Sequence, residues 1–197
     1  MTGIDTAATD AAWVVVDTPL VPQELAEFCR DLERLYRINP YLEFRSWRAA
    51  DGGAVAAFRN LSNGCEFTLR LTLDRLSERE FIVRYDRGLK RRTRFQIEPA
   101  PRGARLVITD EYGGAVPGTD TAEVDRSLHA WGVALHDYLR REARWGRYGI
   151  WRWYMRRVWV PMKPVARRIT FIILLVTLAE IALFALVMAI YWAEQLR

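Results

Sequence analysis

The sequence is poor in the residues that most often build metal and redox sites. Its 197 residues include only two cysteines, Cys29 and Cys65, and two histidines, His129 and His136. Two cysteines make no disulfide framework, and we expect both to be small buried apolar side chains. The histidines are seven positions apart, off the apolar stripe of an expected helix, whereas metal-binding pairs on one helix are usually four apart. The sequence therefore predicts no metal site, no cofactor and two solvated histidines.

Acidic residues are absent from residues 143–168, which carry eight lysines and arginines. The formal charge of the whole chain is +5, so residues 1–142 are mildly acidic, with a net charge of −2. A nucleic-acid-binding domain would carry basic residues on its folded part. Here they gather before an apolar segment, where each contributes roughly 1 kcal/mol of attraction to an anionic leaflet. This distribution predicts anionic membrane lipids as a partner, and no nucleic acid.

Charge is also nearly absent from residues 171–192, where Glu180 is the only charged residue. At a rise of ~1.5 Å per residue, this helix is long enough to cross a ~30 Å hydrocarbon layer. We predict a transmembrane helix over residues 169–193 and a short tail at residues 194–197. The preceding basic residues and the absence of a signal peptide predict a single-pass, tail-anchored protein with its N-terminal domain in the cytoplasm. The high alanine and arginine usage suggests a bacterial source, and with it the bacterial inner membrane.

Glu180 stands near the middle of the predicted span, where a charge costs at least ~2.5–3.5 kcal/mol. We expect it to be neutral or paired with another helix. Ala182, Ala185 and Ala189 form a side of small residues that permits close helix packing. These features predict a homodimer or a membrane partner through the transmembrane helix.

Tryptophans alternate with arginines through the juxtamembrane segment, residues 143–168. Indole rings favour the head-group layer and arginines pair with phosphates, so the pattern predicts an interfacial helix. The residues expected at the membrane interface are Trp145, Arg147, Trp151, Arg152, Trp153, Arg156, Arg157, Trp159, Arg167 and Arg168.

Residues 12–142 are long enough for one globular domain, after a loose N-terminus at residues 1–11. An apolar run at residues 13–16 predicts a strand, and helical spacing predicts one helix from Pro22 through Tyr36, ended by Asn39 and Pro40. Period-two alternation and turn residues then predict antiparallel strands at 42–49, 54–59, 65–74, 81–85, 95–97 and 106–112.

A long helix follows the predicted strands. Asp120 is the expected cap, with Glu123 three residues on, and an apolar stripe runs from Val124 to Leu139. We expect the helix to continue towards Trp159, with interruptions at Gly146 and Gly149. One long helix laid on a curved antiparallel sheet buries both apolar faces, so the fold class is α+β.

This order of elements resembles the START-like, or Bet v 1-like, helix-grip domains, the superfamily of polyketide cyclase/dehydrase and lipid transport proteins. The likeness covers roughly residues 11–145. It rests on the strand at residues 14–19 followed by a helix, on the Asp-Leu-Glu helix that ends at Asn39-Pro40, and on the last strand with its long helix. The family often has tryptophan where this sequence has Ile38. The resemblance implies a hydrophobic cavity between sheet and long helix for lipids, sterols, polyketides or quinones, and it supplies no catalytic residue.

The inward-facing side chains of such a fold are the expected cavity wall. Asp110 shares a face with Ile108, so it is either a buried functional acid or the point where the strand bulges or ends and Asp110 meets solvent or an arginine. Arg70, Arg84 and Arg94 have the opposite phase and are expected on a solvated face. The expected ligand-binding residues are Phe67, Leu69, Leu71, Phe81, Val83, Tyr85, Phe95, Ile108, Asp110, Tyr112, Trp131, Leu135 and Tyr138.

These observations predict a membrane-anchored domain that binds, presents or transfers a hydrophobic, lipid-like ligand at the cytoplasmic membrane face. One alternative is a cyclase or dehydratase that acts on a membrane-soluble substrate, with Asp110 and Tyr112 as acid and base. The other is a membrane-tethered scaffold whose core is filled. No strong catalytic grouping is present, so binding is favoured over catalysis.

Overall fold

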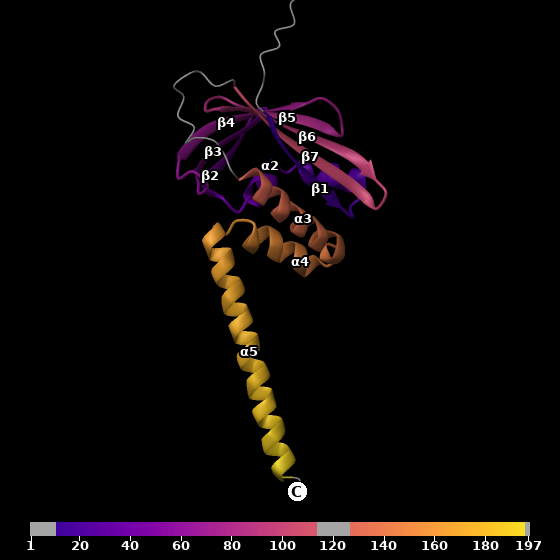
Figure 1. Cartoon of the computed structure of the whole chain (residues 1–197), viewed down its shortest axis with the longest axis vertical. Coiled ribbons are helices and arrows are strands. Elements are labelled where there is room, and N and C mark those ends of the chain that lie inside the picture. Colours follow the sequence, from indigo (N-terminus) through magenta and orange to yellow (C-terminus); the bar gives the residue numbers. More distant parts are fainter. Residues whose placement is uncertain (1–10, 114–126, 196–197) are drawn as a thin grey trace, which may run out of the picture. The chain divides into compact units, whose positions relative to one another are not determined.

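The computed structural model describes residues 11–113 and 127–195. It forms two compact units, Met1–Pro161 and Met162–Arg197. The first unit contains a seven-stranded antiparallel sheet in the order β1-β7-β6-β5-β4-β3-β2 (Figure 1). Its strands are β1 (Ala11–Thr18), β2 (Leu42–Ala50), β3 (Gly53–Asn60), β4 (Glu66–Arg75), β5 (Glu80–Tyr85), β6 (Lys90–Ala100) and β7 (Gly103–Tyr112).

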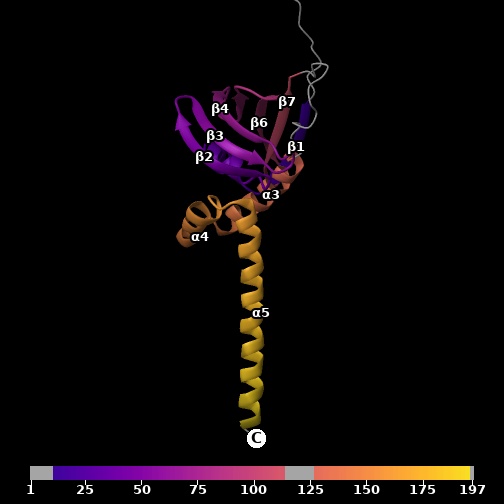
Figure 2. The same cartoon turned by 90° about the vertical axis from the view of Figure 1, so that its left-hand side faces the viewer.

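The sheet is strongly curved, and its inner face carries the core (Figure 2). In β4 and β7 buried residues alternate with more exposed ones, so one face of each of these strands is buried. The register slips once in β2, between Phe44 and Ser46, and once in β6, between Lys90 and Arg92. Such bulges bend a strand and redirect its side chains, and the second one shapes the site described below.

The predicted helix from Pro22 through Tyr36 is wrong in one respect, because the chain forms two helices there. They are α1 (Pro22–Cys29) and α2 (Leu32–Arg37). The carboxylate of Asp31 accepts a hydrogen bond from the backbone N–H of Arg34 at 3.0 Å, so Asp31 caps a new helix instead of continuing the first.

Helix α3 (Leu128–Trp145) lies against the inner face of the sheet. Its predicted cap at Asp120 and the stripe residue Val124 lie outside the described residues. The rings of Trp131 and Phe95 meet edge to face at 5.9 Å, and the Trp131 indole N–H donates to the backbone carbonyl of Leu35 at 3.0 Å. This single side chain therefore joins α3 to both the sheet and α2.

A glycine and a buried asparagine position α3 against its neighbours. Gly132 faces Val14 of β1, and a Cβ at this glycine would lie 2.4 Å from a methyl carbon of Val14, so only glycine permits the close contact between α3 and β1. The buried Asn39 amide donates to the Ser127 hydroxyl at 2.9 Å and accepts from the Tyr41 backbone N–H at 2.9 Å. The Asn39-Pro40 motif thus connects the end of α2, the start of β2 and the start of α3.

The first unit continues beyond the predicted domain boundary at residue 142. After α3 come α4 (Gly149–Tyr154) and the π-helix η2 (Met155–Trp159), separated from α3 at Gly146, where an interruption is predicted. Met155 and Val160 are buried in the core, and the Trp159 ring lies 5.6 Å from that of Tyr138. Part of the expected juxtamembrane segment therefore belongs to the globular unit.

The second unit is dominated by one helix, α5 (Pro164–Gln195). It is long and apolar enough to cross a membrane, and its large apolar side chains are exposed throughout. A curved antiparallel sheet with a long helix on its inner face, followed by an apolar helix, matches the predicted α+β helix-grip fold with a candidate membrane span.

Candidate ligand-binding site

A buried carboxylate marks the site. Asp110 of β7 is completely inaccessible to solvent, as the alternation in this strand predicts. Its two oxygens bind different partners: the Thr93 hydroxyl donates to one at 2.5 Å, and the Lys90 ammonium lies 2.7 Å from the other. The acid is therefore neither at a strand end nor paired with an arginine, which were the simpler expectations. A buried charge needs such compensation, since leaving it dry costs several kcal/mol.

The β-bulge in β6 brings Lys90 to this carboxylate. Thr93 lies opposite Asp110, and simple alternation from Thr93 would place residue 91 inward and residue 90 outward. Because the register shifts between Lys90 and Arg92, Lys90 lies opposite Tyr112 and points to the inner face instead. Its side chain is 17 % exposed, at the border between core and solvent.

Hydroxyl groups extend the polar cluster from Asp110 towards α2. The Tyr85 hydroxyl lies 2.8 Å from the Thr93 hydroxyl and 2.6 Å from the Tyr36 hydroxyl. Burial first, then the neighbouring Tyr85, raises the pKa of Tyr36 well above its ordinary value, against the opposing charge of Lys90. Tyr36 therefore stays a neutral phenol through the physiological pH range.

An apolar cavity of about 60 Å³ opens beside this cluster. It reaches the surface at the β5–β6 turn, where Arg87 and Gly88 are exposed. Drug-sized ligands usually occupy roughly 300–1,000 Å³, so this space admits one end of a ligand in the conformation described. The lining residues are Tyr36, Leu42, Phe58, Asn60, Phe67, Leu69, Tyr85, Arg87, Gly88, Leu89, Lys90 and Tyr112.

The structure separates the expected cavity wall into two groups. Phe67, Leu69, Tyr85 and Tyr112 line the cavity, and Asp110 lies behind it as the partner of a lining residue. The others belong to the core between the sheet and α3; they are Leu71, Phe81, Val83, Phe95, Ile108, Trp131, Leu135 and Tyr138. Of these, Phe81 also lines a separate groove. Large aromatic side chains thus occupy much of the space that the resemblance assigns to a ligand.

Two central residues, Tyr36 and Lys90, were not among the expected site residues. Tyr36 looks like the last position of an apolar helical stripe, and nothing in its spacing marks its hydroxyl as part of a network. Lys90 has the outward phase until the bulge reverses it. The pair of basic residues directly after it, Arg91 and Arg92, gives no signal of a bulge.

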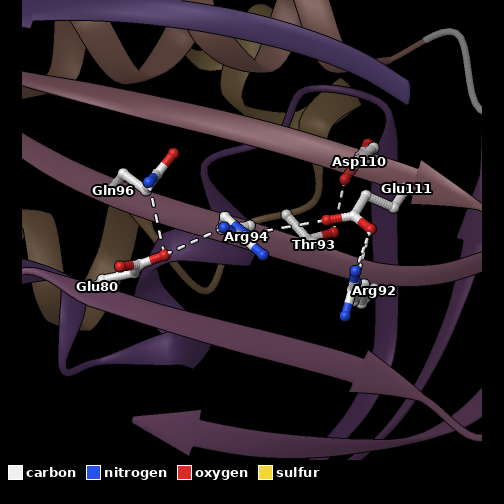
Figure 3. A network of polar contacts seen from close by, with 7 residues as sticks. All are labelled: Glu80, Arg92, Thr93, Arg94, Gln96, Asp110 and Glu111. Atoms are coloured by element: carbon white, nitrogen blue, oxygen red, sulfur yellow. Dashed lines mark hydrogen bonds and ion pairs between the residues drawn. The ribbon is translucent and has the colours of Figure 1, made fainter. Parts of the chain in front are cut away.

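The outer face of the same strands has a different chemistry (Figure 3). Glu111 binds Arg92 at 2.6 Å and Arg94 at 3.9 Å, and Arg94 also lies 3.4 Å from Glu80. Figure 3 shows Thr93 directed to Asp110 while its neighbours Arg92 and Arg94 are directed to Glu111. Among the arginines expected on a solvated face, Arg70 and Arg84 are exposed. Arg94 is only partly exposed, because its side chain lies along the outer face of the sheet between Glu80 and Glu111.

A second buried ionic group joins α2 to α3. The Arg34 guanidinium donates to the Tyr138 hydroxyl at 3.0 Å and lies 2.9 Å from the Glu142 carboxylate. It also stacks over the rings of Phe28 and Tyr138. Burial raises the pKa of Tyr138, with the Arg34 charge opposing the rise. These contacts hold α3 against α2.

The two cysteines are at least partly buried, and the two histidines are exposed. Cys29 is buried, and burial raises the pKa of its thiol from 9.0 to about 12, with Arg34 opposing the rise. Cys65 is half-buried, which is less burial than the sequence predicts. His129 and His136 are exposed, as their positions on α3 predict, and His136 Nδ1 lies 2.8 Å from the Asp17 carbonyl oxygen.

The expected membrane-interface residues before Pro161 fall into two sets. Arg147, Arg152, Trp153, Arg156 and Arg157 are exposed, as is Trp145. Together with Ile150, which is 80 % exposed, the aromatic side chains line an apolar groove of about 460 Å³. Trp159 instead packs on Tyr138, and Trp151 is half-buried with an indole N–H that has no partner among the described residues. In the second unit, Arg167, Arg168 and Glu180 belong to α5.

The fold has counterparts among solved structures. No family model and no curated protein matches the chain. The protein DR_A0006 from Deinococcus radiodurans is similar, with a TM-score of 0.50 and 17 % identity over 70 % of this chain and 98 % of that one. A START superfamily protein from Mycobacterium smegmatis (TM-score 0.48, 16 % identity, 66 % and 96 % covered) and Ara h 8.0201 (0.43, 13 %, 67 % and 98 %) are also found. At these identities the likeness concerns the fold alone.

Proposed function

We propose that the protein binds a hydrophobic, lipid-like ligand whose end enters the cavity beside Tyr36, Tyr85 and Lys90, and that it holds, presents or transfers this ligand at the membrane. The observation that supports this most is the cavity itself: apolar walls with a few convergent polar groups are the usual composition of a small-molecule site. The helix-grip fold, which commonly carries hydrophobic small molecules, agrees with it.

We further propose that α5 anchors the domain in a bilayer, with the domain on the cytoplasmic side. The helix exposes apolar side chains along its length, and the preceding residues carry lysine and arginine without acidic residues. Basic residues close to a span favour the cytoplasmic side. The apolar groove around Ile150 and Trp153, flanked by exposed arginines, has the chemistry of a surface that contacts anionic head groups. Protease treatment of inside-out and right-side-out bacterial inner-membrane vesicles tests the orientation: the domain is cleaved only in the former.

A scaffold role is the second candidate, because a specific observation favours it. The rings of Tyr36, Phe95 and Trp131 contact one another at 5.2–6.4 Å and fill the space between sheet and α3. A domain with a filled core needs no ligand for stability. On this account, protein partners bind its surface or α5, where Glu180 is the candidate contact for a homodimer or a membrane partner. Crosslinking that yields only monomers, with Glu180→Leu having no effect, would exclude the contact through Glu180.

An enzymatic role has less support. Both oxygens of Asp110 are engaged by Lys90 and Thr93, and the raised pKa of Tyr36 makes its phenol a poor proton donor near neutral pH. An Asp110→Asn variant that retains ligand but loses turnover would restore the enzyme hypothesis.

Two matched variants of the full chain test ligand binding. Phe58 lines the cavity, whereas Phe44, its ring neighbour at 5.3 Å, does not; both are half-buried. We expect apolar molecules to co-purify with wild type and Phe44→Trp at one per chain above the detergent and lipid background. Phe58→Trp should lose them, because the larger ring occupies the cavity. Equal amounts in all three proteins would contradict the proposal.

A further inference from the structure

The donor and acceptor roles along the buried polar chain follow from a count of protons. Asp110 is the acceptor at the end of the chain: the Thr93 hydroxyl donates to one of its oxygens, and the Lys90 ammonium lies 2.7 Å from the other. Thr93 has one hydroxyl proton, and it donates that proton to Asp110. The proton shared between Thr93 and Tyr85, whose oxygens are 2.8 Å apart, therefore belongs to Tyr85.

The same count decides the last link. Tyr85 has given its only proton to Thr93, so the contact of 2.6 Å between the Tyr85 and Tyr36 hydroxyl oxygens requires the proton of Tyr36. Every hydroxyl in the chain is thus directed towards the buried carboxylate. Among the residues that the structure describes, the Tyr36 hydroxyl hydrogen-bonds only to Tyr85, so its oxygen retains lone-pair capacity and has no proton to offer.

Tyr36 also lines the cavity, which gives its oxygen a role in recognition. We propose that the cavity selects ligands whose polar end is a hydrogen-bond donor, a hydroxyl or N–H group, and that this end bonds to the phenol oxygen of Tyr36. This inference rests on the proposed ligand-binding function and names the chemical class of the ligand: an apolar alcohol, phenol or amide.

The same geometry disfavours ligands whose polar end can only accept hydrogen bonds. An ether or ester oxygen at this position would meet the Tyr36 oxygen with lone pairs on both sides. A carboxylate would place a negative charge against the lone pairs of the same oxygen. In either complex the Tyr36 oxygen and the ligand oxygen would both be removed from water without forming a hydrogen bond to each other, which weakens binding.

Two small probes that differ in one proton test the proposal with the full chain in nanodiscs. Binding of 4-fluorophenol and 4-fluoroanisole is measured by ¹⁹F NMR, with empty nanodiscs as background. We expect the phenol to bind wild type roughly tenfold more tightly than the ether, about the value of one hydrogen bond. In Tyr36→Phe this preference should disappear, whereas Tyr41→Phe, a half-buried tyrosine outside the cavity, should keep it.

The outcomes separate this proposal from the one on which it depends. Equal binding of both probes to wild type, or a preference that survives in Tyr36→Phe, overturns the assignment of Tyr36 and leaves the ligand-binding function standing. Binding of neither probe to wild type overturns both. Unfolding curves of Tyr36→Phe and Tyr41→Phe, recorded alongside, show whether a loss of binding in either variant is a loss of fold.

Discussion

The ammonium of Lys90 lies 2.7 Å from the fully buried carboxylate of Asp110, and it does so because a β-bulge turns Lys90 inward. Buried pairs of this kind contribute little net stability when intact, but removal of one partner leaves an uncompensated charge. The pair consequently makes the region beside the cavity sensitive to single substitutions and tolerant of matched ones.

Substitution of Lys90 should therefore be costly. We expect Lys90→Met to lower the free energy of unfolding by about 3–5 kcal/mol, because Asp110 loses its counter-charge. The double variant Lys90→Met/Asp110→Asn should recover a substantial part of that loss. Urea unfolding followed by tryptophan fluorescence measures both. Arg84→Met is the control, since its pair with Asp74 is exposed and is expected to contribute less than ~1 kcal/mol. Equal losses for Arg84→Met and Lys90→Met would contradict the account.

The direction of the hydroxyl chain predicts an asymmetry between its two tyrosines. Tyr85→Phe removes the central link and leaves a donor on Tyr36 and an acceptor on Thr93 unpaired. Tyr36→Phe removes only the hydrogen bond between the Tyr36 and Tyr85 hydroxyls. We expect Tyr85→Phe to destabilise the domain by about 2–3 kcal/mol and Tyr36→Phe by about 1 kcal/mol. Thermal unfolding of both variants and the double variant checks the order, and a larger loss for Tyr36→Phe would reverse the deduced direction.

Arg34 should not tolerate replacement by lysine. Its guanidinium bonds to Tyr138, pairs with Glu142 and stacks over two rings, and a lysine ammonium on its flexible stem cannot reproduce this planar arrangement. We expect Arg34→Lys to cost about 2–3 kcal/mol of unfolding free energy. The matched change Arg30→Lys affects an exposed pair with Glu27 and should stay within about 0.5 kcal/mol. Similar values for the two variants would show that Arg34 is not a structural node.

The raised pKa of Cys29 predicts alkaline sensitivity. The folded-state pKa of about 12 exceeds the ordinary value of 9.0, so the folded protein binds the thiol proton more tightly than the unfolded chain does. The associated stability is complete below about pH 9 and is lost as the pH rises towards 12, by up to ~1.4 kcal/mol per pH unit. The raised pKa values of Tyr36 and Tyr138 act in the same direction.

Two measurements check the alkaline prediction. Urea unfolding at pH 8, 9 and 10 should give falling stability, and Cys29→Ala should flatten the dependence. At pH 8, iodoacetamide should label the half-buried Cys65 in the folded protein and reach Cys29 only after unfolding. Rapid labelling of Cys29 in the native state would disprove its burial.

Much of the fold could be predicted because its signals are local. Clean alternation in β4 and β7 identifies the inner face and places Asp110 on it, and Asn39-Pro40 ends α2 as predicted. The errors arise where one residue interrupts a period. Asp31 begins a new helix inside an apparently continuous stripe, and the bulge at Lys90 reverses the phase of β6.

The candidate site was less predictable than the fold, for a physical reason. Whether a side chain lines a cavity or fills it depends on the shapes of residues distant in sequence. Trp131 and Phe95 occupy space between the layers, while Phe67 and Tyr85, which have the same inward phase, border open volume. Tyr36 joins the site only because α2 delivers its hydroxyl to Tyr85 across 49 positions of sequence. No periodicity carries that information.

The most direct test of the central claim is native mass spectrometry of the intact chain released from detergent micelles. We predict that a major population carries one additional apolar molecule, which collisional activation releases and whose fragmentation shows a hydroxyl or N–H group. Phe58→Trp should be found at the mass of the bare chain. If the wild-type chain also appears only at its bare mass, and remains so after incubation with lipid alcohols, the cavity holds no ligand and the filled-core scaffold is the better account.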